Sequence, residues 1–162
     1  MKAFLLMGLA AFLTACAPAI SKDSLRTADP ALTFPMLAKD PDSYRGKNIL
    51  VGGQILNTQA KDGETWVEVL QKPLDWRQEP KDTDESYGRF LIRFPGFADP
   101  AVYAAGKKIT LLGEVEGKKI QRLKEMDYPY PVLLPREHHL WRPEDEGGRF
   151  HFGIGVGVGV YR

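Results

Sequence analysis

The sequence predicts a mainly β domain that carries short helices. Two observations support this fold class: several short stretches alternate apolar and polar residues, and 16 glycines and 12 prolines separate those stretches. A length of 162 residues corresponds to one domain, and a hydrophobic content of 43% is ordinary for a globular protein. The formal net charge of +1 argues against a nucleic-acid-binding protein, because such proteins concentrate basic residues.

The expected elements follow one another with turn residues between them. The clearest strand is Gly88–Phe94, in which every second residue is aromatic or aliphatic and the arginines face the other way. In chain order we expect a helical turn over 33–39, strand 48–57, an Asp-Gly turn at 62–63, strand 65–71, a loop over 72–87, strand 88–94, a short helix over 99–105, strand 108–115, a turn at 116–117 and strand 118–123. Further extended pieces are expected over 130–134 and 139–141.

The middle of the first expected strand contains Gly52-Gly53. Glycine inside a strand marks a bulge or a sharp bend, as at the corner of a barrel. The order of three strands, a short helix and two strands is that of the oligonucleotide/oligosaccharide-binding (OB) fold. We therefore predict a small OB-like β-barrel, while the order alone also permits another small barrel or a sandwich.

The amino terminus has the layout of a lipoprotein signal peptide. A positive Met1-Lys2 start precedes 13 residues without a charge, Ala3–Ala15, whereas a spanning helix needs roughly 20. This stretch ends in Leu13-Thr14-Ala15-Cys16, which resembles the lipobox of bacterial lipoproteins. We predict cleavage between Ala15 and Cys16, a diacylglyceryl thioether on the Cys16 thiol, and acylation of the new amine.

The predicted anchor sets the expected location and the division of the chain. Cleavage leaves 21 basic and 21 acidic residues, so attachment depends on the lipid rather than on a basic cluster. Position 17 is not the Asp that favours inner-membrane retention in enterobacterial lipoproteins, which implies the outer membrane, with the domain facing the periplasm. We expect a signal peptide (1–15), a lipidated terminus and flexible tether (16–31), the OB-like domain (32–142), and a charged loop with a C-terminal strand (143–162).

Several short strings along the chain, taken together, point to one protein family. They are Tyr44-Arg45-Gly46-Lys47, Gly52-Gly53, the residues 68–75 and 86–90, Pro95-Gly96-Phe97, Asp99-Pro100, the residues 128–131, and His139-Leu140-Trp141. With these strings and the lipobox, most of the chain resembles the Slp family of starvation-inducible outer membrane lipoproteins. The resemblance implies a lipoprotein linked to starvation or envelope stress. It implies no enzymatic activity, cofactor or catalytic residue.

The sequence contains no recognisable catalytic or metal-binding motif. His138 and His139 are adjacent, so on an extended segment they point to opposite faces and cannot readily share one metal ion. The acidic residues lie in loop-like runs, where a solvated surface is their usual role. The single cysteine is assigned to the lipid. We therefore predict that the protein is not an enzyme and binds no metal or cofactor.

Aromatic and arginine residues on the expected strands form a candidate ligand face. OB-fold faces stack sugars or bases on aromatic side chains, and a glycan suits the envelope better than a nucleic acid. The alternative is packing in the core, which is the expected role of Phe90 and Phe94. The candidate ligand residues are Trp66, Tyr87, Arg89, Arg93, Tyr128, Tyr130 and Trp141.

Residues Gly153–Val160 alternate glycine with a branched aliphatic residue. As a strand, this segment would have one aliphatic and one bare face, so we expect an edge strand of the domain's own sheet. The alternative is pairing with a partner or a second copy. For the whole chain we predict a lipid-anchored outer membrane lipoprotein with a structural or interaction role. The alternative is a binding module for a glycan, a peptidoglycan fragment, a lipid headgroup or a peptide.

Overall fold

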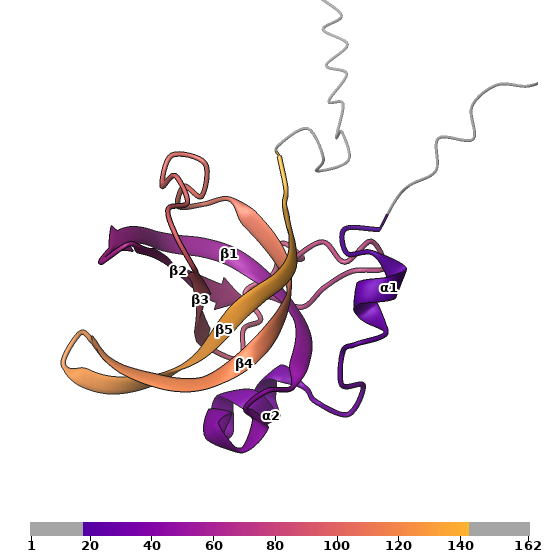
Figure 1. The fold of residues 1–162 in the computed structure, drawn as a ribbon, viewed down its shortest axis with the longest axis horizontal. Helices are drawn as coiled ribbons and strands as arrows, with labels where there is room; N and C mark the ends of the chain where they lie inside the picture. The colour runs from indigo at the N-terminus through magenta and orange to yellow at the C-terminus, as the bar shows by residue number, and fades with distance from the viewer. Residues whose placement is uncertain (1–17, 143–162) are drawn as a thin grey trace, which may run out of the picture.

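The computed structural model describes residues 18–142, so the predicted signal peptide, Cys16 and the Gly153–Val160 segment lie outside the described residues. The prediction of a mainly β fold with few short helices is confirmed (Figure 1). The elements are α1 (Lys22–Leu25), α2 (Phe34–Lys39), the 3₁₀ helix η1 (Pro41–Tyr44), β1 (Asn48–Lys61), β2 (Glu64–Gln71), β3 (Arg89–Phe94), β4 (Lys108–Leu123) and β5 (Met126–Leu140).

The five strands form one closed sheet in the order β1-β2-β3-β5-β4, and β4 returns to β1. Neighbouring strands are antiparallel except β3 and β5. These two run parallel and pair only at Leu91 with Val132 and at Ile92 with Leu133. This short seam, which we call the β3–β5 seam, is where the sheet closes.

Strand β1 belongs to both halves of the sheet because it changes partner along its length. Its first half pairs with β4, its second half pairs with β2, and Gly53 lies opposite both Ile109 and Gln71. A Cβ atom at position 53 would lie 2.0 Å from the carbonyl oxygen of Leu70. A glycine is therefore required where two strands approach the same backbone, which gives the expected bend at Gly52-Gly53 its physical cause.

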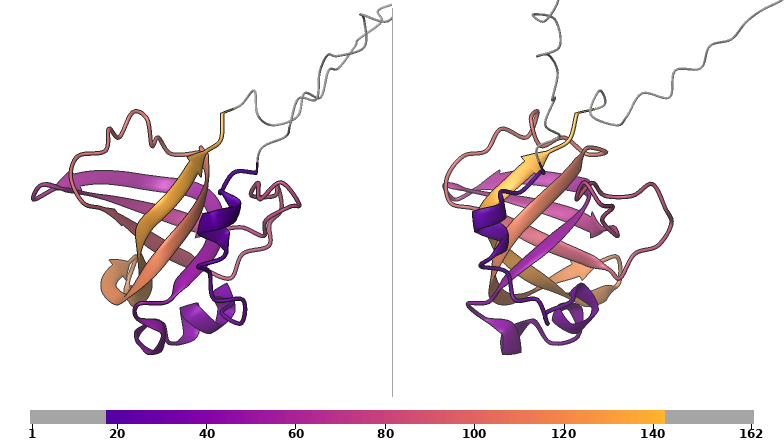
Figure 2. Two further views of the ribbon diagram at one scale, coloured as in Figure 1. Left: turned by 45° about the vertical axis from the view of Figure 1, so that its right-hand side comes forward. Right: turned by 90° about the vertical axis from the view of Figure 1, so that its right-hand side faces the viewer.

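The interior of the closed sheet is an apolar core. Every second residue of the central parts of β1 and β3 faces it, in the parity that the sequence predicts: Ile49, Val51, Ile55, Phe90, Ile92 and Phe94 are all buried. Helix α2 covers one end of the sheet (Figure 2). There the ring of Phe34 packs 5.7 Å from that of Phe90, and Leu37 is wholly buried.

Two expected connections are wrong. No helix forms over 99–105; the chain makes turns in which the N–H groups of Val102 and Tyr103 donate to the Asp99 carbonyl at 2.9 and 3.1 Å. So short a helix is marginal without tertiary support, and in this structure α2 packs into the core instead. Glu116-Gly117 is not a turn but part of a β-bulge within β4, and the hairpin turns at Lys124 and Glu125.

The amino-terminal part of the described chain packs against the sheet, where a flexible tether up to residue 31 was expected. Ile20 is wholly buried, and its N–H donates to Gln78 Oε1 at 2.8 Å. The Ser21 N–H and hydroxyl both donate to the Glu137 carboxylate at 2.8 Å. Ala28 then forms a parallel bridge with Asn48 of β1. Buried apolar contact and hydrogen bonds order this segment, which alternation alone could not reveal.

Candidate functional site

The outer side of β2 and β3, beside the projecting part of the β4–β5 hairpin, gathers most of the candidate residues; we call this surface the outer face. Because side chains alternate along a strand, Val67 and Val69 enter the core while Trp66 and Glu68 face outward. On β3, Arg89 and Arg93 point to the same outer side. The members contributed by the hairpin are Glu116, Lys119, Tyr128 and Tyr130.

An aromatic cluster forms the floor of the outer face. Leu91, Tyr130 and Val132 are buried together, and Trp66 and Tyr128 pack against them. The rings of Tyr128 and Tyr130 meet edge-on at 4.6 Å between centroids. The ammonium group of Lys119 lies 3.5 Å from the centroid of the Trp66 ring, a cation–π contact that covers this indole.

Arg89 and Glu68 form the polar centre of the outer face. Arg89 Nη1 donates to Glu68 Oε1 at 2.8 Å, and the Tyr130 hydroxyl donates to the same oxygen at 2.9 Å. The backbone N–H of Arg89 donates to the Tyr128 hydroxyl at 3.0 Å. Burial, followed by the hydrogen bond to Glu68, raises the pKa of Tyr130 to about 12. Glu68 thus holds an arginine and a neutral phenol in fixed positions.

Arg93 is bound by two carboxylates at the other end of the outer face. Its Nη1 donates to Glu64 Oε1 at 2.6 Å, and its Nε donates to Glu116 Oε2 at 2.7 Å. A further bond joins Nη2 to Glu116 Oε1. Hydrogen bonding to Glu116, the largest cause, raises the pKa of Arg93. Each nitrogen of the Arg93 guanidinium therefore already donates to a protein carboxylate.

A cavity of about 560 Å³ opens beside Arg89 at the tip of the β4–β5 hairpin. Leu123 and Met126 contribute apolar walls, and the Met126 side chain is 63% exposed. Tyr87, which precedes β3, is 58% exposed, and its neighbour Gly88 lies against the Tyr128 hydroxyl. An arginine beside exposed apolar groups can accept a ligand that has both a polar and an apolar part.

Trp141 does not belong to the outer face. It is buried after the end of β5, where its Nε1 donates to Thr110 Oγ1 at 2.9 Å. Its ring meets His139 edge-on at 4.6 Å, and the Arg77 guanidinium lies 5.6 Å from its centroid. Here the structure gives a packing role to a residue that the sequence had grouped with the ligand face.

The two histidines point to different surroundings, which is the expected arrangement. His138 Nε2 lies 2.8 Å from the Tyr103 hydroxyl, whereas His139 contacts Trp141. Among residues 18–142, no group of three His, Cys, Asp or Glu side chains is placed to hold a metal ion. The prediction that the protein needs no metal or cofactor stays a prediction.

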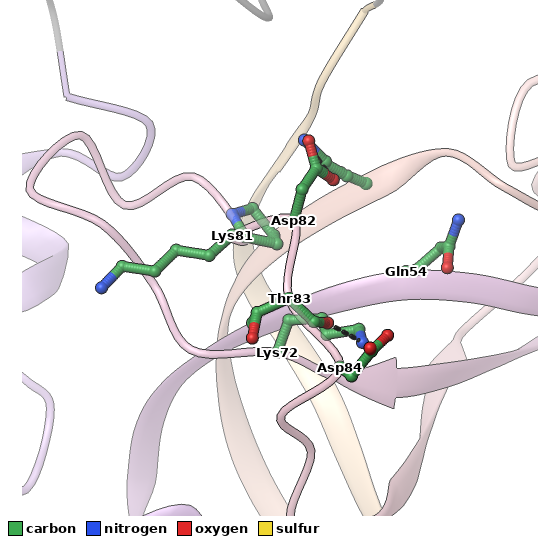
Figure 3. Close-up of a pocket in the computed structure, with 8 residues that line it drawn as sticks. Gln54, Lys72, Lys81, Asp82, Thr83 and Asp84 are labelled. Atoms are coloured by element: carbon green, nitrogen blue, oxygen red, sulfur yellow. Dashed lines mark hydrogen bonds and ion pairs between the residues drawn. The ribbon is translucent and has the colours of Figure 1, made fainter.

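A second cavity, of about 360 Å³, is polar and lies between the 72–87 loop and strands β1 and β4 (Figure 3). Lys72 donates to the Thr83 carbonyl, and Lys108 Nζ lies 3.2 Å from carboxylate oxygens of Glu79 and Asp82. In Figure 3 the Lys81 side chain extends away from the other labelled side chains. The two ion pairs of Lys108 hold the loop to β4, and the Lys72 bond to Thr83 closes the loop on itself.

Sequence reasoning missed the acidic partners of the outer face. Glu64 and Glu68 precede their arginine partners by 29 and 21 residues, and Glu116 follows Arg93 by 23 residues, so the sequence alone did not connect them. The β2–β3 register places Glu64 and Glu68 beside the arginines, and the β4 bulge brings in Glu116. For Glu64 and Glu68, the alternation of polar and apolar residues in β2 was the one feature of the sequence that indicated a shared outward face.

The comparison with protein families decides the identity of the chain. The model of the outer membrane lipoprotein Slp family matches residues 13–152. The chain belongs to the Slp family. This confirms the resemblance and the predicted location, because Slp family members are outer membrane lipoproteins. Within residues 18–142, no helix is long and apolar enough to cross a membrane.

Individual relatives agree with this membership. Outer membrane protein Slp of Escherichia coli K12 is 28% identical over 143 residues, which cover 86% of this chain and 74% of that protein. A Haemophilus influenzae relative, described as "Uncharacterized protein", is 31% identical over 96 residues, and "Uncharacterized lipoprotein YeaY" of E. coli K12 is 27% identical over 101 residues. The alignments span 59% and 62% of this Slp-family chain and about half (52%) of each of those two proteins. No solved structure matches the chain.

Proposed function

We propose that this Slp-family protein is held at the outer membrane by lipid on Cys16 and has a structural or interaction role in the envelope, without enzymatic activity. The observation that supports the anchor is the extent of the family match. It begins at residue 13 and therefore includes Leu13-Thr14-Ala15-Cys16. We further propose that the protein faces the periplasm and acts under starvation or envelope stress, which rests on the family alone.

The anchor is tested with Cys16→Ser in the full-length precursor. We expect this variant to keep its signal peptide, to incorporate no labelled fatty acid, and to leave the outer membrane fraction. Ser86→Ala, a substitution at an exposed position in the described part of the chain, is the matched control and should be processed and labelled normally. Normal acyl labelling and membrane fractionation of Cys16→Ser would exclude the anchor.

We also propose that the closed sheet is an OB-fold barrel. Its strand order, the partner change of β1 at Gly53 and the parallel β3–β5 seam support this assignment. The helix between the third and fourth strands is absent, and α2 covers the core instead. Backbone NOEs between Leu91 and Val132 in the isotope-labelled protein test the topology. An antiparallel pattern there, or none, would contradict it.

A binding module for a glycan, peptidoglycan fragment, lipid headgroup or peptide is the second candidate function. The cavity beside Arg89 favours it, because an exposed apolar wall adjoins a fixed cation there. Titration with soluble muropeptides should shift the amide resonances of Arg89 and Met126. Met126→Asp should abolish these shifts, whereas Met36→Asp, at another exposed methionine, should not. Unchanged spectra would exclude muropeptides as ligands of this surface.

Self-association through Gly153–Val160 remains a separate proposal, since this segment lies outside the described residues. The test is deletion of residues 153–162, followed by sedimentation analysis. Loss of an oligomer with a monomer of unchanged melting temperature would support pairing between copies. Unfolding of the truncated chain would support a strand of the domain's own sheet.

A further inference from the structure

The most exposed large apolar side chain among the described hydrophobic residues is Trp76, which is 82% exposed. It lies at the tip of the turn over residues 74–80, in the connection between β2 and β3. Exposed tryptophan is unusual on a soluble surface, because its large ring gains much by burial. The neighbourhood of this turn indicates what could cover the ring.

The turn is rigid, so Trp76 is held outward rather than left on a mobile loop. Leu74 and Pro80 form a β-bridge at its base. At its tip the Asp75 carboxylate accepts hydrogen bonds from the N–H groups of Arg77 and Glu79, both at 2.8 Å. Because the backbone of the turn is already ordered, little backbone entropy is lost when its tip binds a surface.

The same turn is attached to the rest of the fold at two further points. The Gln78 carbonyl accepts a hydrogen bond from the Thr110 hydroxyl of β4 at 2.6 Å. The Gln78 side chain accepts the N–H of Ile20 at 2.8 Å, and Ile20 itself is wholly buried. The amino-terminal chain therefore enters the fold directly beside the Trp76 turn.

This entry point lies close to the proposed lipid anchor. Cys16 precedes Ile20 by only four residues, and an extended chain spans at most about 3.6 Å per residue, so the two Cα atoms lie within about 14 Å of each other. A lipid on Cys16 must keep the Trp76 turn near the bilayer surface. The indole of tryptophan favours the headgroup region, where its apolar ring and its N–H are both satisfied.

We propose that Trp76 docks into the phospholipid surface and fixes the orientation of the domain on the membrane. The proposal rests on the lipid anchor proposed above. With Trp76 docked, the side of the molecule that carries α1 faces the bilayer, and the tip of the β4–β5 hairpin points away from it (Figure 1). The cavity beside Arg89 is then open to envelope partners instead of the membrane.

The test uses the mature, acylated protein reconstituted into phosphatidylcholine vesicles, with phosphatidylglycerol added in a second series. Phospholipids brominated near the headgroup end of the acyl chain quench nearby tryptophans. Wild-type emission should shift to shorter wavelength and be quenched. Trp76→Ser should lose both changes, since Trp141 is buried and Trp66 is partly buried on the outer face under the Lys119 ammonium group. Equal quenching of wild type and Trp76→Ser, or none in either, overturns the proposal.

A matched control moves the indole to another loop. Phe97 is 77% exposed and follows β3, so Trp76→Phe/Phe97→Trp keeps the number of aromatic residues unchanged. Its emission should not be quenched, and quenching equal to that of wild type would overturn the specific role of position 76. Flotation of the same vesicles separates the two proposals. Wild type that floats without quenching retains the anchor and refutes docking, and wild type that fails to float refutes both.

Discussion

The guanidinium of Arg93 on β3 binds both oxygens of the Glu116 carboxylate in the bulge of β4. Strands β3 and β4 are not neighbours in the sheet, because β5 lies between them. The pair therefore spans the β3–β5 seam, where the backbone contributes only two residue pairs. Glu64 binds the same guanidinium from β2, so a single side chain links three strands.

Arg93→Gln should destabilise the protein by roughly 1–3 kcal/mol, because two partly buried carboxylates lose their donor. Urea unfolding measures the change in the free energy of unfolding. Arg122→Gln, the same substitution at an exposed position of β4, should stay within about 0.5 kcal/mol of wild type. In a double-mutant cycle with Glu116→Gln we expect a coupling of about 0.5–3 kcal/mol. Additive effects would mean that the pair does not reinforce the seam.

Gly53→Ala should destabilise the protein by roughly 1–3 kcal/mol or more, since the added methyl group would overlap the Leu70 carbonyl. Thermal unfolding followed by circular dichroism measures the loss. Gln59→Ala, in the exposed half of β1, is the control and should change stability little. A Gly53→Ala protein as stable as wild type would show that β1 does not need its close approach to β2.

Deprotonation of Tyr130 at alkaline pH should lower the stability of the protein. Burial and the hydrogen bond to Glu68 raise the pKa of Tyr130 to about 12. A raised pKa means that the folded state favours the neutral phenol, so stability is fully present below the ordinary value of about 10. The free energy of unfolding should then fall between pH 10 and about 12. Tyr130→Phe should reduce this fall in urea titrations, whereas Tyr87→Phe, at an exposed ring, should leave it unchanged.

Acid should release the amino-terminal segment from β5. Hydrogen bonds from the Ser24 hydroxyl, followed by the Ser21 N–H and hydroxyl, lower the pKa of Glu137. The stability that this carboxylate contributes is present above its ordinary value of 4.5 and is lost as the pH falls through the lower folded value. The Ser21 amide resonance should report this release in an NMR titration. Glu137→Gln should remove the pH dependence, and an unchanged titration would contradict this role.

The parts of the fold that depend on local pattern were predictable. Alternation identified the interior faces of β1 and β3, and the Asp-Gly sequence located the β1–β2 turn, where Asp62 and Gly63 both have positive φ. The turn predicted at Glu116-Gly117 was wrong, because glycine is suited equally to a turn and to a β-bulge. At a φ of +114°, Gly117 lets β4 continue instead of reversing.

Long-range packing was not predictable from the same patterns. Ile20 is an isolated apolar residue in a polar stretch, and its burial depends on the Trp76 turn, which comes much later in the chain. The outer face shows the same limit. Its aromatic and arginine members stood out by type, but the register that matches Arg89 with Glu68 exists only once β2 and β3 have paired. Trp141 is a tryptophan like Trp66, but its side chain is buried beside Thr110 and does not reach the outer face.

The β3–β5 seam also sets an order of assembly. The β1–β2 and β4–β5 hairpins join residues close in sequence and can form early, whereas Leu91 must wait for Val132. The closed sheet therefore cannot form until residue 133 is available, when most of the domain has already been synthesised. Until then the apolar faces of β2 and β3 lack their cover, and a chaperone that protects the incomplete chain would have to act during that interval.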